Sequence, residues 1–390
     1  MPSVNPGTVT ARRIFDGEQF LEGHGLILNG EVIEAIVPAG QLPSDTAHCD
    51  LGDATLAPGL IDIQVNGGGG VMLNNAPCVE SVIRMASAHR RFGTTGLAPT
   101  IISDTPEVLK AAAEAVSAAR DGGAAEVLAL HIEGPHFDMA RRGTHKADMI
   151  RPLNSADMAW LCSLQSLPVI LTLAPEHTQP GQLRALAEAG LLLCAGHTDA
   201  SYERIQEALA EGLRGFTHLF NAMSPLASRA PGTVGAALDA DNAWAGIIAD
   251  GHHVHPAAIR AAHRAKAAGK LLLVSDAMAT VDGPDSFEIY GETITVRNGA
   301  LINAEGSLAG SAIALIDAVR ISHHQVGLEL SECLRMASLY PATFLKLDDQ
   351  LGRLRPGYRA DLVAFNEDFN VSDTWVAGQH QHHATTEPRT

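Results

Sequence analysis

The chain lacks the features of membrane-spanning and exported proteins. It has no uninterrupted apolar stretch of about 18 residues, which a helix would need to cross a bilayer. Its amino end, MPSVNPGTVTARRIF, has no charged start followed by an apolar run, so we expect no export signal. The five cysteines never form a CxxC pair, which argues against a disulfide framework or a cysteine zinc site. We therefore expect a cytoplasmic protein with reduced thiols.

Basic residues are scarce relative to acidic ones. The 390 residues include 27 lysines and arginines against 44 aspartates and glutamates, a formal net charge of −17. Such a charge would repel the phosphate backbone of nucleic acid and an anionic membrane surface, so neither is an expected partner. An anionic small molecule would need a local basic pocket. Hydrophobic residues make up 46% of the chain, which is enough for a sizeable core.

Eight short apolar runs with little alternation are typical of strands buried on both faces, as in parallel sheets. Alanine-rich segments with helix formers at helical spacing separate them, for example SYERIQEALAEGL. Strand and helix alternating eight times predict an α/β fold, a (β/α)8 TIM barrel. The runs are residues 59–66, 95–102, 126–133, 169–176, 191–198, 215–222, 244–251 and 271–278.

The two ends of the chain read differently. Residues 8–57 contain β-like pieces such as GLILNG, and the tail contains ADLVAFN and VSDTWVAG. Each end is too short to bury a core alone, so we expect one small β-sandwich domain from residues 1–57 and 357–390, and the barrel from 58–356. The segment GETITVRNGALI after the eighth run predicts a hairpin with its turn at Asn298-Gly299. The last stretch, GQHQHHATTEPRT, is polar, and we expect its His380, His382 and His383 to lie in a frayed, solvated tail.

Nearly every predicted strand ends in a polar or ionisable residue, and the carboxyl ends of barrel strands form one rim. A single histidine in such a place is more often structural, Glu133 could cap a turn, and Asp276 could cap the next segment. Together, a carboxylate and two imidazoles form a hydrolytic zinc-type ligand set that leaves a coordination position open for water. The rim residues are Gln64, Asn66, His131, Glu133, Glu176, His197, His218, Asp250, His252, His253 and Asp276.

Eight segments in this order resemble the N-acetylglucosamine-6-phosphate deacetylase family of the amidohydrolase superfamily: HIEGPHF, RRGTHK, LAPEH, AGHTDA, FTHLFNAMSPLASRAPG, IADGHHV, LVSDAM and GSLAGS. The resemblance runs from about residue 50 to 360. It implies deacetylation of N-acetyl-D-glucosamine 6-phosphate, one divalent metal ion held by Glu133, His197 and His218, and Asp276 as the catalytic base and acid. The ligand set suits Zn²⁺ first, and also Fe²⁺, Mn²⁺ or Co²⁺.

The resemblance also implies substrate contacts. His145 would act in catalysis and, with Thr144, would contact the substrate. Asn221 would offer a side-chain contact and Ala222 a backbone contact. The sugar would be covered by Leu308, Ala309 and Gly310. Arg229 and His253 would bind the phosphate, with Arg229 reaching in from the neighbouring subunit of a homodimer. An arginine fork and an imidazole suit a phosphate dianion, although Arg229 could also be a solvated loop charge.

The first predicted strand carries Gln64 and Asn66 where related metal hydrolases carry two histidines. Amides are poorer ligands than imidazole for zinc-like ions, so we expect one metal ion and no second. Gln64 could hold a water or a sugar hydroxyl, or be a structural amide bonded to the backbone.

Three rival functions follow from the same residues. The substrate could be N-acetylgalactosamine 6-phosphate, which differs at one hydroxyl. A base deaminase or cyclic amidase is disfavoured by Gln64 and Asn66. A non-catalytic sugar-phosphate sensor should have lost Asp276 or a metal ligand, and none is lost.

Overall fold

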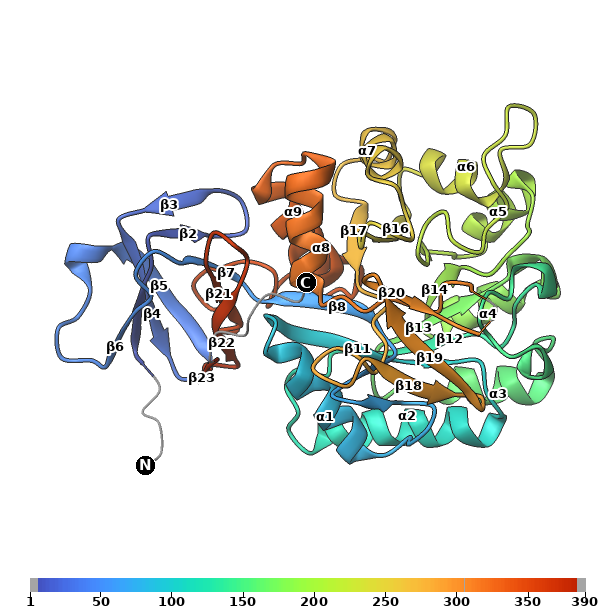
Figure 1. Cartoon of the computed structure of the whole chain (residues 1–390), viewed down its shortest axis with the longest axis horizontal. Coiled ribbons are helices and arrows are strands. Elements are labelled where there is room, and N and C mark those ends of the chain that lie inside the picture. The colour runs from blue at the N-terminus through green and yellow to red at the C-terminus, as the bar shows by residue number, and fades with distance from the viewer. Residues whose placement is uncertain (1–5, 305, 384–390) are drawn as a thin grey trace.

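The computed structural model describes residues 6–304 and 306–383, and a parallel eight-stranded barrel dominates it (Figure 1). Its strands are β8 (Leu60–Val65), β11 (Thr94–Ile102), β12 (Leu130–Glu133), β13 (Val169–Leu173), β14 (Leu192–Ala195), β15 (Gly215–Phe216), β16 (Trp244–Ile248) and β17 (Leu271–Val274). Each strand pairs with the next in this order. A parallel bridge between Val65 and Ala277 brings β8 and β17 together. The predicted (β/α)8 fold is confirmed.

A helix follows each barrel strand. Local sequence explains where these helices begin: the hydroxyl of Thr105 accepts a hydrogen bond from the N–H of Val108 before α2, and Ser201 does the same for Arg204 in α5. The helices are α1 (Val79–Arg90), α2 (Pro106–Asp121), α3 (Ser155–Ser163), α4 (Gln182–Glu188), α5 (Tyr202–Ala210), α6 (Gly232–Asp239), α7 (Pro256–Ala265) and α8 (Leu315–Ile321). After α8 come a π-helical turn (Ser322–Val326), α9 (Leu330–Met336) and α10 (Leu339–Phe344).

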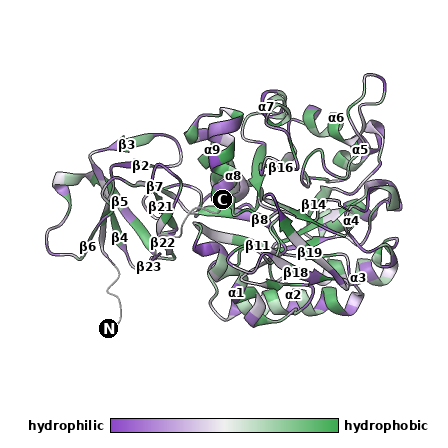
Figure 2. Cartoon of the chain, viewed as in Figure 1, coloured by the Kyte–Doolittle hydropathy of each residue, from purple (hydrophilic) through white to green (hydrophobic). Residues whose placement is uncertain are grey.

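Apolar side chains fill the space on both sides of the barrel wall. The larger cluster lies between strands and helices and includes Leu97, Val116 and Leu171. A smaller cluster includes Ile61 and Ile170 and packs against α10. Figure 2 shows β14 as apolar, whereas α1 and α2 carry both apolar and polar residues. The core therefore runs along the strands and leaves their carboxyl ends for polar residues.

The two ends of the chain build the remaining large sheets, to one side of the barrel (Figure 1). Their strands are β1 (Thr8–Thr10), β2 (Arg13–Phe15), β3 (Phe20–Glu22), β4 (His24–Asn29), β5 (Val32–Pro38), β6 (His48–Asp50), β7 (Thr55–Pro58), β21 (Leu362–Phe365), β22 (Val371–Val376) and β23 (Gln379–His382). One sheet has the order β5-β4-β1-β6 and the other β23-β22-β21-β7-β2-β3, with Ile14, Leu26 and Trp375 in one shared core. The expected joint contribution of both ends is confirmed, while the boundaries at 57/58 and 356/357 stay predictions.

Two small hairpins lie outside the barrel and the terminal sheets. The predicted hairpin exists: β19 (Glu292–Arg297) pairs with β20 (Ala300–Ile302) around Asn298-Gly299, and β18 (Ser286–Ile289) completes the sheet. A further small hairpin joins β9 (Gly67–Gly68) to β10 (Val71–Met72).

The expectation of a frayed tail from residue 378 was wrong for its histidines. Strand β23 pairs with β22, and His380 and His382 both bond to Oδ1 of Asp373 at 2.8 and 3.0 Å. His383 is buried beside Thr374, with 2.9 Å between its Nε2 and the threonine hydroxyl. Hydrogen bonds to a buried carboxylate thus order a segment that has no apolar pattern. Residues 384–390 lie outside the described part of the chain.

Within residues 6–304 and 306–383, no helix combines the length and the apolar character that crossing a bilayer requires. The five cysteines are all unpaired, as expected.

Candidate active site at the barrel mouth

The carboxyl ends of the barrel strands surround a cavity that is open to solvent. Most of the residues that the sequence singled out meet there. The cavity is lined by Asn66, Ile102, Glu133, Gly143, Thr144, His145, His197, His218, Asn221, Ala222, Ile248, His253, Asp276, Met278, Leu308 and Gly310.

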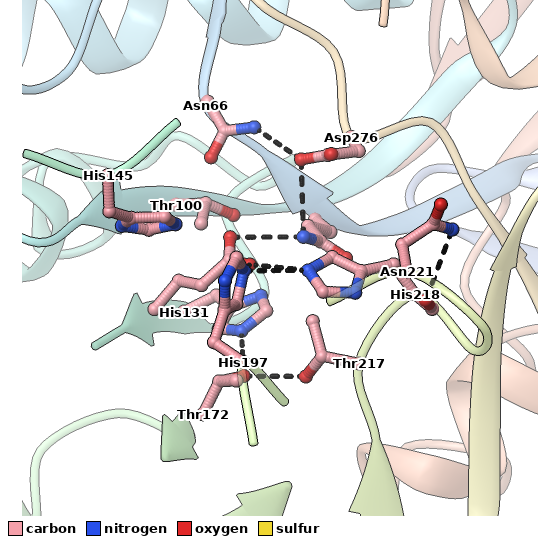
Figure 3. Close-up of polar contacts among 12 residues, drawn as sticks. Asn66, Thr100, His131, His145, Thr172, His197, Thr217, His218, Asn221 and Asp276 are labelled. Carbon is pink, nitrogen blue, oxygen red and sulfur yellow. Dashed lines mark hydrogen bonds and ion pairs between the residues drawn. The ribbon is translucent and has the colours of Figure 1, made fainter. Parts of the chain in front are cut away.

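Glu133, His197 and His218 converge on one buried point from three strand ends (Figure 3). Oε1 of Glu133 lies 3.3 Å from Nε2 of His197 and 3.0 Å from Nε2 of His218, and the two Nε2 atoms are 3.0 Å apart. All three residues are at most 5% exposed. Two imidazoles and one carboxylate with their donor atoms this close form a group that could hold a metal ion, in agreement with the ligand set expected from the sequence.

Neighbouring groups prepare these side chains for an ion. Nδ1 of His197 donates to the carbonyl of Arg141 at 2.9 Å, so the Nε2 of the neutral ring carries a lone pair. The ring also stacks on Phe137, with centroids 4.3 Å apart, which fixes its plane. Burial alone would raise the pKa of Glu133, but the neighbouring imidazoles of His197 and His218 hold this pKa well below its usual range. Glu133 is therefore an anion at neutral pH, as a metal ligand must be.

Three of these positions have an unusual backbone conformation. The backbone φ angles of His197, His218 and Asp276 are 49°, 34° and 53°. These values lie in the left-handed region, which residues other than glycine and asparagine seldom adopt. Each lies two residues after the end of a barrel strand, so the backbone turns sharply where the side chain enters the cavity. Such strain concentrates at functional sites and supports a functional interpretation of the cluster.

Asp276 is held by the two amides of the first strand. Nδ2 of Asn66 donates to its Oδ1 at 2.7 Å, and Nε2 of Gln64 donates to the same oxygen at 3.2 Å (Figure 3). Nε2 of Gln64 also donates to Oε2 of Glu133 at 3.0 Å. Gln64 therefore joins the two carboxylates, and it does not bond to the backbone through this amide nitrogen.

A β-bulge explains why Gln64 reaches both carboxylates. On β11, Leu97 pairs with Asp62 and Pro99 pairs with Val65, so β8 has one residue more than its partner over this stretch. An extra residue re-aims the side chains that follow it. The N–H of Asp276 donates to the carbonyl of Gln64 at 3.1 Å, which fixes Asp276 beside the bulge.

The protonation states of Asp276 and His145 suit different tasks. Burial, reinforced by the charge of Glu133, raises the pKa of Asp276 to about 6, a value that suits a group that accepts and returns a proton. Burial, with repulsion from His197, holds the pKa of His145 well below its usual range, so this ring is neutral. The N–H of Ser103 donates to Nδ1 of His145 at 3.3 Å, which assigns the ring proton to Nε2.

One side of the cavity carries groups that could meet an anion. Nδ1 of His253 lies 2.6 Å from Oδ2 of Asp250, and this contact orients the ring along the cavity wall. Asn221 and Ala222 lie on the turn after β15, and Nδ2 of Asn221 donates to the carbonyl of His218 at 3.3 Å. Arg229 is exposed on the following loop and does not line the cavity of its own chain.

Two further expected contact residues also lie outside the cavity. Ala309 is fully buried between the lining residues Leu308 and Gly310. Gln64 lies beneath the cavity and borders the barrel interior instead. Glu176, a rim residue, accepts hydrogen bonds from the hydroxyl of Thr198 and the N–H of Asp199, away from the metal-ligand group.

Two roles were not found from the sequence alone. His131 points into the barrel, where its Nδ1 donates to the carbonyl of Ile63 at 2.9 Å and the hydroxyl of Thr172 donates to its Nε2 at 2.8 Å. It lies two residues before Glu133, and this alternation was the available signal for its inward position. Asn66 was noted only as a poor metal ligand, whereas the structure places it against Asp276 and on the cavity wall.

Comparisons with known proteins agree with this geometry. The amidohydrolase family model matches residues 55–380, and the NagA composite domain model matches residues 8–56. An N-acetylgalactosamine-6-phosphate deacetylase from Shewanella sp. (strain ANA-3) is 41% identical over 86% of this chain and 85% of its own length. An N-acetylglucosamine-6-phosphate deacetylase from Haemophilus influenzae is 33% identical over 94% of this chain and 97% of its own length.

Solved structures show the same fold. The crystal structure of N-acetylglucosamine-6-phosphate deacetylase from Pasteurella multocida superposes with a TM-score of 0.94 at 35% identity, covering 97% of this chain and 100% of that one. A Mycobacterium smegmatis N-acetyl-D-glucosamine-6-phosphate deacetylase in complex with N-acetyl-D-glucosamine-6-phosphate gives 0.89 at 28% identity, covering 97% and 99%. The barrel, the ligand group at its mouth and these matches lead to one conclusion: the chain is an enzyme that belongs to the amidohydrolase family.

Proposed function

We propose that the enzyme hydrolyses the acetamide of N-acetyl-D-glucosamine 6-phosphate to D-glucosamine 6-phosphate and acetate. The observation that carries this proposal is the meeting of Glu133, His197 and His218 at one buried point, with Asp276 on the wall of the same cavity. Relatives that bear the names of N-acetylhexosamine 6-phosphate deacetylases support the choice of substrate.

Glu133, His197 and His218 would hold one divalent ion. The donor set fits such an ion because the carboxylate is ionised and the tautomer of His197 leaves Nε2 free to bind. Zn²⁺ suits two imidazoles and a carboxylate best, and Fe²⁺, Mn²⁺ and Co²⁺ are further candidates. Such an ion acts as a Lewis acid that lowers the pKa of water and polarises a carbonyl. Amides in place of two histidines at the carboxyl end of β8, on Gln64 and Asn66, support a single ion.

Asp276 would act first as base and then as acid. Its Oδ1 is occupied by the amides of Gln64 and Asn66, which leaves Oδ2 to take a proton from the attacking water. The same oxygen would return the proton to the leaving nitrogen. The Nε2–H of neutral His145 would donate to the acetyl oxygen as negative charge develops there, a contribution of about 3 to 4 kcal/mol for one well-placed donor.

The phosphate would be held by His253 and by Arg229 of a neighbouring subunit. The contact with Oδ2 of Asp250 orients the ring of His253 on the cavity wall, where it would meet a phosphate oxygen. Arg229 lies too far out on its loop to line its own cavity, which favours a homodimer in which each subunit completes the site of the other. Thr144, Asn221, Ala222 and the loop of Leu308, Ala309 and Gly310 would contact the sugar, whereas Gln64 acts through Asp276 and Glu133.

A second candidate substrate is N-acetyl-D-galactosamine 6-phosphate, which the name of the Shewanella relative favours. Acetate release from both sugar phosphates by the same metal-loaded protein decides between them. We expect kcat/KM to be higher for the glucosamine derivative. A higher value for the galactosamine derivative would reassign the substrate, and no acetate from either would refute the proposed reaction.

A further inference from the structure

Two residues that line the cavity, Asn66 and His218, each have a buried polar atom without a hydrogen-bond partner within the described residues, and the atom of Asn66 is its side-chain oxygen. Oδ1 of Asn66 is buried and accepts no hydrogen bond, although the residue is 0% exposed and lines the cavity. A buried amide oxygen without a hydrogen-bond donor destabilises the protein, because nothing replaces the hydrogen bonds that it would make to water. Figure 3 shows this oxygen turned away from Asp276, on the side of the cavity where His145 lies.

The orientation of the Asn66 amide follows from its surroundings. Its nitrogen must face Asp276, because an amide oxygen placed 2.7 Å from a carboxylate oxygen would repel it. The N–H of Asn66 donates to the carbonyl of Ala277 at 2.8 Å, so the backbone is fixed as well. The side chain therefore presents an acceptor to the cavity, beside the carboxylate that handles the proton.

We propose that Oδ1 of Asn66 binds the N–H of the substrate acetamide and, after cleavage, the amine of the product. This inference rests on the proposed function and adds a substrate-positioning residue to it. The scissile nitrogen must come within reach of Asp276 to receive a proton, and that places it next to the amide of Asn66. The acetamide N–H is a donor that needs an acceptor once water is excluded.

This contact would orient the leaving nitrogen. When water attacks the acetyl carbon, the nitrogen gains a localised lone pair. If Asn66 holds the N–H, this lone pair points away from Asn66 and toward Oδ2 of Asp276. Gln64 provides the contrast, because its amide reaches the same Oδ1 of Asp276 but borders the barrel interior and not the cavity. Asn66 should therefore distinguish substrates with and without an N–H, and Gln64 should not.

The test compares Asn66→Ala with the matched control Gln64→Ala on two substrates: N-acetyl-D-glucosamine 6-phosphate and 2-O-acetyl-D-glucose 6-phosphate, an ester without the N–H. We expect Asn66→Ala to lower kcat/KM for the amide about 10-fold more than for the ester. Gln64→Ala should lower both values by the same factor. Equal losses on both substrates in Asn66→Ala would overturn the inference.

A binding measurement separates this role from a structural one. We expect Asn66→Ala to weaken competitive inhibition by D-glucosamine 6-phosphate about 10-fold while leaving inhibition by 2-deoxy-D-glucose 6-phosphate, which has no donor at that carbon, unchanged. If Asn66→Ala does not fold, Asn66→Ser serves in both measurements, since its side chain is too short to reach the same position. Equal weakening of both inhibitors, or the loss of a second bound metal ion in the variant, would contradict the proposal. Wild-type protein that releases no acetate from the amide would refute the proposed function itself.

Discussion

The Nε2 atoms of His197 and His218 lie 3.0 Å apart, and both face Oε1 of Glu133. Three donor atoms held this close could hold a cation between them. We therefore expect His218→Ala to lose its bound divalent ion. Replacing a residue that only supports a metal ligand lowers activity by up to about 100-fold, so the loss of a ligand should lower kcat by more than that. Elemental analysis of purified protein measures the ion. His252→Ala, at an exposed neighbour of the cavity, should keep both ion and activity.

Asp276 should be needed for turnover and not for the metal ion. Asp276→Asn keeps the shape of the side chain but removes the proton acceptor, so we expect normal metal content and a fall in kcat of about 100-fold to 10,000-fold. Activity close to that of the wild type would remove Asp276 from the mechanism.

The pH dependence of kcat/KM should show the titration of Asp276. Burial raises the pKa of this carboxyl to about 6, and a bound cation would lower it. A base must be deprotonated, so we expect kcat/KM to rise with pH and to reach a plateau at or slightly above pH 6. The residual activity of Asp276→Asn should lack this acidic limb. A limb that persists in the variant would assign it to another group.

Asp62 should make the fold less stable as the pH rises. Among the residues that the structure describes, its Oδ2 has no hydrogen-bond partner, and burial raises the pKa of its carboxyl to about 7. The folded protein keeps a proton that the unfolded chain releases near pH 4, so this contribution to stability is lost as the pH rises from about 4 to 7. We expect Asp62→Asn to raise Tm by a few degrees at pH 8 and by less at pH 5. A Tm change that is the same at both pH values would contradict this assignment.

Arg229 should act on the substrate of its neighbour. Arg229→Ala should raise KM for the phosphorylated sugar much more than for unphosphorylated N-acetyl-D-glucosamine, because only the former carries the dianion. At a substrate concentration well below the raised KM of Arg229→Ala, mixing this variant with Asp276→Asn, with subunit exchange, should give about a quarter of the wild-type activity. Half of the random dimers then contain one intact site out of two. No recovery despite exchange would place Arg229 in its own subunit.

The barrel and its metal-ligand group could be predicted because parallel strands bring their carboxyl ends to one rim. That rule placed Glu133, His197 and His218 on one rim with other polar residues, and the resemblance to a deacetylase family selected these three as ligands. The turn at Asn298-Gly299 was equally local, since both residues tolerate the positive φ values of 53° and 79° that the hairpin needs.

Other features depend on contacts that the sequence does not show. The contact of Gln64 with two carboxylates depends on a bulge in β8, and a bulge is decided by pairing with β11. The order of β23 depends on Asp373, because His380 and His382 have no apolar pattern that marks them as a strand. Arg229 is exposed in a single chain, so its expected role requires a second subunit that one sequence cannot place.

Removal and return of the metal ion tests the central claim most directly. Protein stripped with a chelator should release no measurable acetate from N-acetyl-D-glucosamine 6-phosphate, and one equivalent of Zn²⁺, Fe²⁺, Mn²⁺ or Co²⁺ per subunit should restore turnover. Stripped protein that hydrolyses the sugar phosphate at the original rate would contradict the assignment of Glu133, His197 and His218 as the ligands of a catalytic ion.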